Sequence, residues 1–99
     1  MRATLLALLL TVAMPAAAED FRPLPLHEAA RIVTQRYHGR LIGARMTLAN
    51  PHERSLGALL VEELRLLTPE QNLLVIRLDA RTGRFLEVAG IGQTEALKR

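Results

Sequence analysis

The chain has 99 residues and no cysteine, so it can form one small domain without a disulfide framework or thiol chemistry. Its formal net charge is +3, and it contains one tyrosine, two phenylalanines and no tryptophan. The arginines are scattered along the chain, whereas a nucleic-acid surface needs clustered cations and stacking aromatics. A nucleic-acid partner is therefore not expected.

The first 18 residues have the composition of a secretory signal peptide. Arg2 gives a short positive start, an apolar stretch follows, and Ala16–Ala18 supply the small residues that signal peptidase accepts. We therefore expect cleavage near Ala18, a periplasmic or secreted protein, and no membrane span after cleavage. An uncleaved N-terminal anchor is the alternative, although the apolar stretch is shorter than the ~20 residues that span a bilayer.

A single helix is predicted near the start of the exported part. Residues 19–25 contain two prolines and no periodicity, which indicates an extended leader. Apolar residues then recur at helical spacing and predict a helix over Leu26–His38, with Gly39 as the left-handed residue that ends it. Alanines on the apolar face favour close approach to a sheet, and that face consists of Leu26, Ala29, Ala30, Val33 and Tyr37.

Two strands are predicted directly after this helix. Arg40–Asn50 alternates between apolar and other residues, as a half-buried strand does, and a polar turn or loop follows at Asn50–Ser55. The apolar residues of Gly57–Thr68 would suit either a helix or a strand. We favour a strand, because the short turn Thr68–Gln71 then joins it directly to an antiparallel neighbour.

The last two strands form a hairpin. Asn72–Asp79 is apolar on nearly both faces, so it should lie centrally in the sheet or be covered on its second face. A shorter strand is expected at Arg84–Ala89, with Leu86 and Val88 facing inward. Residues 91–99 contain glycine and then polar residues, and we expect them to form a flexible tail.

The turn of the hairpin has specific chemistry at Asp79, Thr82 and Gly83. The Asp79 carboxylate can accept hydrogen bonds from N–H groups two or three residues later, and Gly83 can adopt positive φ without a Cβ clash. These residues are interpreted as structural. Together the elements predict an α+β fold, with one N-terminal helix packed on an antiparallel sheet of three to four strands in the order α-β-β-β-β.

Two segments resemble the PepSY domain family. The helix contains H-E-A-A-R-I-V at His27–Val33, and the hairpin contains D-A-R-T-G at Asp79–Gly83. The similarity covers roughly Leu24 to Gly90, and it implies a PepSY-like domain over residues 26–90. Leu60-Val61-Glu62 stands where the family often has an aromatic residue, and Thr-Pro-Glu-Gln replaces Asp-Gly before the third strand. The resemblance implies a small exported protein that restrains peptidases or regulates envelope processes, with no associated set of catalytic residues.

Several polar residues are candidates for a catalytic or metal-binding site. His27 and His38 would lie about 16 Å apart along the helix and so cannot share an ion. His52 and Glu53 are adjacent in a loop, which leaves a small-ligand or metal-sensing domain as the alternative function. Glu62 and Glu63 should point to opposite faces of a strand, and Ser55 has no recognisable base. We expect no enzyme activity, no cofactor and no metal site.

The remaining feature is an apolar surface. A sheet with one helix has one uncovered face, and Leu73 and Val75, joined by Leu67 and Leu41, are predicted to form a partner surface there. Loops or the leader would be the alternative cover for this face. An exposed strand edge would also accept a peptide as an added strand. The sequence thus favours a non-enzymatic module that binds an envelope protein or peptide, as a peptidase inhibitor or a regulatory accessory.

Overall fold

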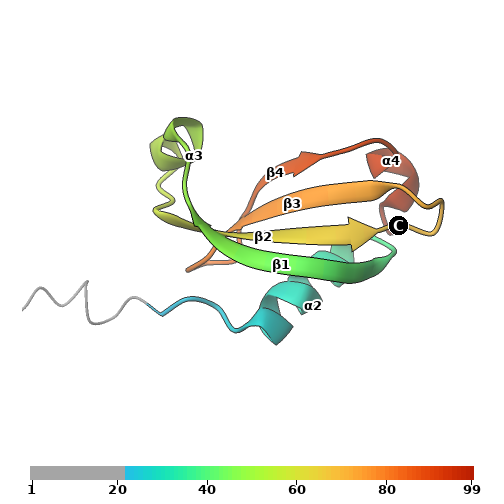
Figure 1. Ribbon diagram of the computed structural model, residues 1–99, viewed down its shortest axis with the longest axis horizontal. Helices are drawn as coiled ribbons and strands as arrows, with labels where there is room; N and C mark the ends of the chain where they lie inside the picture. The colour runs from blue at the N-terminus through green and yellow to red at the C-terminus, as the bar shows by residue number, and fades with distance from the viewer. Residues whose placement is uncertain (1–21) are drawn as a thin grey trace, which may run out of the picture.

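The computed structural model describes residues 22–99, so the predicted signal peptide and residues 19–21 of the leader lie outside the described residues. One helix packs on one face of a four-stranded antiparallel sheet, and the strands lie in chain order (Figure 1). The predicted α+β fold is confirmed. The elements are α2 (Leu26–Arg36), β1 (Arg40–Leu48), α3 (Pro51–Ser55), β2 (Leu60–Leu67), β3 (Leu73–Asp79), β4 (Phe85–Ala89) and α4 (Gln93–Ala96).

The main core lies between α2 and the sheet. Ala29 and Val33 of α2 are fully buried, and the small side chain of Ala29 allows the helix backbone to approach the strands closely. The central strands contribute one apolar face each, because alternate side chains of a strand point to the same side. The strand residues of this core are Leu64, Leu66, Leu74, Ile76 and Leu78.

Strand β2 resolves the ambiguity of the segment Gly57–Thr68. Leu64 and Leu66 are both fully buried beneath α2. Residues two positions apart face the same side in a strand, in which successive side chains point to opposite faces. Each residue of β2 also pairs with β1 on one side, and most pair with β3 on the other. The predicted strand is confirmed, and β2 and β3 are the two central strands.

The end of α2 differs from the prediction. The helix ends at Arg36 rather than at His38, because Tyr37 has extended backbone angles (φ −125°, ψ 142°). Tyr37 forms an isolated antiparallel bridge with Leu97, near the C-terminus. This long-range pairing replaces the last predicted turn of the helix.

The C-terminal segment that produces this bridge is folded, which corrects the predicted flexible tail. Residues 93–96 form the short helix α4, and Ala96 is fully buried in the main core. His38 N–H donates to Ala96 O at 2.7 Å, and Lys98 N–H donates to Arg36 O at 2.8 Å. The segment is therefore attached to the end of α2 by backbone hydrogen bonds as well as by packing.

The hairpin between β3 and β4 contains a register shift at Arg77 and Leu78. As a result Phe85 packs against the main core beside Tyr37, with ring centroids 6.3 Å apart. Leu86, which was predicted to face inward, instead packs on the other face of the sheet. There it joins a small second cluster of Ala49, Ala58 and Val61. Val88 packs against the main core, as predicted.

The turn before β4 also holds the leader. Asp79 Oδ1 accepts a hydrogen bond from Arg81 N–H at 2.9 Å, Thr82 Oγ1 accepts one from Arg84 N–H, and Gly83 has φ 79°. Leu24 N–H donates to Ala80 O at 2.7 Å, which places the chain before α2 alongside this turn. The turn thus aligns the start of the helix with the end of the sheet.

Candidate functional site

The face of the sheet opposite α2, here called the outer face, is crossed by a row of charged residues. Strand register places them side by side, one on each strand. Positive and negative side chains alternate along the row, so each charge has an opposite neighbour across the strands. In order from β1 to β4 the residues are Arg45, Glu63, Arg77 and Glu87.

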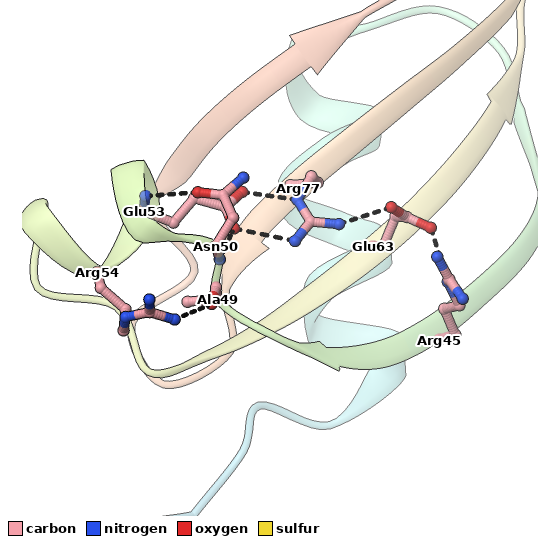
Figure 2. Close-up of polar contacts among 7 residues, drawn as sticks. All are labelled: Arg45, Ala49, Asn50, Glu53, Arg54, Glu63 and Arg77. Atoms are coloured by element: carbon pink, nitrogen blue, oxygen red, sulfur yellow. Dashed lines mark hydrogen bonds and ion pairs between the residues drawn. The ribbon is translucent and has the colours of Figure 1, made fainter.

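Arg77 is the centre of this row. Its guanidinium donates to Glu53 at two points, with Nε to Oε2 at 2.6 Å and Nη2 to Oε1 at 2.9 Å (Figure 2). Its Nη1 donates to Glu63 Oε2 at 2.7 Å. Glu63 Oε1 in turn accepts from Arg45 Nε at 2.8 Å. Two carboxylates therefore hold one guanidinium across the sheet surface, in the fork geometry that Arg favours.

Glu53 reaches Arg77 because of the way α3 begins. Asn50 Oδ1 accepts from Glu53 N–H at 2.7 Å, and Glu53 Oε1 accepts from Asn50 N–H at 2.9 Å, which is a capping box. Arg54 Nη1 donates to Ala49 O at 2.8 Å and fixes the start of the same turn. The segment Asn50–Ser55, predicted as a polar turn or loop, is thus a short helix that folds over the outer face.

The ionisation of these groups follows from their contacts. Hydrogen bonds from Arg77 lower the pKa of Glu53 below its ordinary value, against the opposing effect of burial. Hydrogen bonds from Arg45 and then Arg77 lower the pKa of Glu63 in the same way. The two carboxylates raise the pKa of Arg77. All three groups are therefore charged at neutral pH, and the network is an ionic bridge rather than a proton donor or acceptor.

The predicted partner surface lies on the half of the outer face that α3 does not reach. Leu67 and Leu73 pair directly across β2 and β3, and Val75 lies further along β3 opposite Arg65. Leu73 is 44% exposed, while Leu67 and Val75 are half-buried. Leu41 does not join them, because it pairs with Leu66 and packs against the main core on the α2 side.

A shallow hollow adjoins this surface at the end of the sheet. Its volume is about 240 Å³, and it shares Leu67 with the outer face. Arg40, which pairs with Leu67 across the strands, lies at its side and is exposed. The turn between β2 and β3 contributes Thr68, Pro69 and Gln71 to the lining, and Gly39 precedes Arg40 there. The hollow is large enough for one or two side chains of a bound chain.

The residues considered for a metal site are separated in the structure. Glu53 has both carboxylate oxygens bound to Arg77 and is 0% exposed, whereas its neighbour His52 is exposed. His27 and His38 are exposed near opposite ends of α2. Among residues 22–99 no three His, Cys, Asp or Glu side chains gather around a possible ion position. Glu53, the carboxylate that the metal-sensing alternative requires, therefore has both oxygens hydrogen-bonded to Arg77.

Glu62 and Glu63 lie on opposite faces of β2, as the alternation predicts. Glu62 faces the α2 side between Met46 and Leu78 and is only 5% exposed. Burial raises its pKa, and its Oε1 has no hydrogen-bond partner within the described part of the chain. A buried carboxyl oxygen without a hydrogen-bond partner costs stability.

No family model, curated protein or solved structure matches the chain. Within residues 22–99, none of the helices has the length and apolar character needed to cross a bilayer.

The sequence contained signals for the charged network that pattern reading missed. Asn50, Pro51 and Glu53 have the spacing of a capping box with proline in the first turn, which predicts a helix start. Arg45, Glu63 and Arg77 each occupy the polar face of an alternating strand, but their pairing depends on the register between strands. The contact of Glu53 with Arg77 has no local signal, because it depends on how α3 folds over the sheet.

Proposed function

We propose that this protein is a non-enzymatic, PepSY-like module that binds an envelope protein or peptide through the outer face of its sheet. The observation that supports this most directly is the division of that face. One half is occupied by α3 and the ion network, and the other presents Leu67, Leu73 and Val75. An apolar strip on a rigid sheet, beside a hollow, has the character of a protein-binding surface.

Exposed arginines beside the strip suggest the charge of the partner. Arg40 pairs with Leu67, and Arg65 pairs with Val75, so both lie in the same cross-strand rows as the apolar residues. Both are exposed, and the ion pairs of residues 22–99 do not include them. A partner segment with apolar side chains flanked by Asp or Glu would match this surface in both shape and charge.

The cellular role rests on sequence features. The signal peptide features of residues 1–18 support export to the periplasm, where a small cysteine-free domain would meet peptidases and sensor proteins. The resemblance of His27–Val33 and Asp79–Gly83 to PepSY domains supports a role as a peptidase inhibitor or as a regulatory accessory. Both roles use the same surface, because each requires only that the domain bind and occupy a segment of another protein.

The test is capture of a partner by purified protein on a solid support. We expect that wild-type protein retains at least one envelope protein from periplasmic extract and that Leu73→Glu with Val75→Glu releases it. Leu48→Glu is the matched control, since Leu48 is 76% exposed and lies on β1 in the row of Leu60, on the α2 side. Thermal unfolding of each variant shows that the fold is retained. Equal capture by all three proteins would refute the proposed surface.

The two roles are separated by a second measurement. If the captured protein is a peptidase, an inhibitor lowers its hydrolysis of a peptide substrate in proportion to the amount of domain added. A regulatory accessory binds without changing that rate. The Leu73→Glu and Val75→Glu variant should lose either effect, whereas Leu48→Glu should retain it.

A further inference from the structure

A second hollow lies on the α2 side of the sheet, away from the proposed partner surface. Its volume is about 560 Å³, which is within the range of small-molecule sites. Helix α2 supplies Ile32, Gln35 and Arg36, and the start of β4 supplies Phe85. Lys98, after α4, and Gly83 and Arg84, before β4, complete the lining.

The hollow has an excess of positive charge. Arg36, Arg84 and Lys98 all line it, and within residues 22–99 no Asp or Glu does. The ion pairs in this part of the chain use Arg31, Arg45 and Arg77 as cations instead. Arg36 and Lys98 repel each other beside a hollow that has no carboxylate, and a bound anion would relieve that repulsion.

Contacts within the fold hold these cations in place. Arg36 lies with its guanidinium carbon 3.9 Å from the centroid of the Phe85 ring, which leaves the edge of the guanidinium available. Lys98 Nζ donates to Thr34 O near the end of α2, and Arg84 Nη2 donates to Leu56 O at 2.6 Å. The positive charge of Lys98 thus partly offsets the negative C-terminal end of the α2 dipole. The guanidinium of Arg36 contacts the Phe85 ring instead.

We propose that this hollow binds a small organic carboxylate. The carboxylate would accept paired hydrogen bonds from the edge of the Arg36 guanidinium, with Lys98 as a second positive charge. Ile32 and Phe85 form the apolar part of the lining, and Gln35 adds an amide beside them. A ligand with one carboxylate and a small apolar group therefore matches the hollow better than an inorganic ion.

The probe is benzoate, titrated into purified protein and followed by NMR. We expect saturable shifts at the Arg36 side-chain N–H and at the Phe85 ring, with no saturable shift from the neutral analogue benzamide. Inorganic phosphate should bind more weakly, because it lacks the apolar group. Equal binding of benzoate and benzamide, or equal binding of benzoate and phosphate, would overturn the proposed ligand class, as would the absence of saturation.

Variants assign the binding to the hollow. Arg36→Gln and Lys98→Gln should each weaken benzoate binding roughly tenfold, the size expected for one charge-assisted hydrogen-bonded contact. Arg45→Gln is the matched control, because Arg45 is an exposed arginine on the outer face and lies outside the proposed partner surface. An equal loss of affinity in Arg45→Gln would show a diffuse effect of net charge and would refute the site. If Arg36→Gln lowers the thermal stability, Lys98→Gln provides the same test with fewer packing contacts removed.

The anion site is independent of the proposed partner surface. Leu73→Glu, which should abolish partner capture, should leave benzoate affinity unchanged because Leu73 lies on the other face of the sheet. A failure of benzoate binding would leave the partner surface intact, and a failure of partner capture would leave the anion site intact.

Discussion

Arg77 and Glu53 are separated by 24 positions in the chain, yet they form a two-point ion pair with contacts of 2.6 and 2.9 Å. Glu53 has no solvent exposure, and only 15% of the Arg77 side chain is exposed. This pair attaches α3 to the outer face of the sheet. It therefore determines which half of that face remains uncovered.

Replacement of Glu53 tests the strength of this attachment. Glu53→Gln keeps an oxygen for the capping box but removes the charge opposite Arg77, which then retains only Glu63. We expect a loss of about 1.5 to 3 kcal/mol in the free energy of unfolding, as for other hydrogen bonds to charged groups. Urea unfolding measures this value.

The control for this prediction is Arg45→Gln. The Arg45 side chain is 65% exposed, so its pair with Glu63 is largely screened by water. We expect a loss below about 1 kcal/mol. A loss in Arg45→Gln as large as that in Glu53→Gln would mean that burial does not determine the strength of this network.

The same network predicts how stability changes in acid. The folded-state pKa values of Glu53 and Glu63 lie below the ordinary value of 4.5, so both groups contribute stability that is complete above that pH. The contribution is lost as the pH falls below 4.5 through the folded-state values. Urea midpoints from pH 6 to pH 2 should show this loss for wild-type protein. Glu53→Gln should show a smaller loss, since one of the two groups is missing.

Glu62 has the opposite effect in a different range of pH. Burial raises its folded-state pKa above 4.5, so folding favours the protonated form. Its penalty is greatest above the folded-state pKa and disappears as the pH falls toward 4.5. Glu62→Gln should therefore stabilise the protein by about 1 to 2 kcal/mol at pH 8 and by much less at pH 4.5. Equal effects at the two pH values would show that Glu62 does not titrate in this range.

The sequence alone predicted most of the fold because local patterns determine it. Ala29 and Val33 mark the buried face of α2, and Leu74 and Ile76 mark the buried face of β3, through spacings visible in the chain. The helix in Asn50–Ser55 also had a local signal in its capping residues. That signal was missed because the segment is short and has no apolar periodicity.

The parts that could not be predicted depend on contacts between distant residues. Tyr37 leaves the helix because it pairs with Leu97, and no pattern around Tyr37 indicates this. Leu86 changes face because of a register shift between β3 and β4, which reverses the side on which a side chain lies. The hollow beside Arg36 likewise requires the C-terminal segment to fold back. The charged network and the two hollows were therefore less predictable than the sheet.

Gly83 supports both the turn and the start of α2. It has φ 79°, and a Cβ placed there would lie 2.6 Å from Ile32 Cδ1 and 2.9 Å from Leu24 Cδ1. Gly83→Ala should therefore combine backbone strain with displacement of two side chains, and we expect a loss of about 2 to 4 kcal/mol. Gly57→Ala is the matched control, with φ 96° and no atom within 4 Å of the added Cβ. Its loss of stability should come from backbone strain alone, and we expect about 1 to 2 kcal/mol. Thermal or urea unfolding of the two variants should show this difference, and equal losses would mean that crowding at Gly83 is relieved without cost.

Ala96 tests whether the C-terminal segment is part of the domain. It is fully buried in the main core, although it lies only three residues before the end of the chain. Ala96→Asp should bury a charge without a partner and either destabilise the protein by several kcal/mol or release α4 from the sheet. Hydrogen exchange separates these outcomes. Release would increase exchange at His38, whose N–H donates to Ala96 O, and at Lys98, whose N–H donates to Arg36 O, while the strands stay protected. The exposed neighbour Glu95 is the control, and Glu95→Ala should change neither stability nor exchange. Rapid exchange at His38 and Lys98 in the wild-type protein would instead support the flexible tail that the sequence predicted.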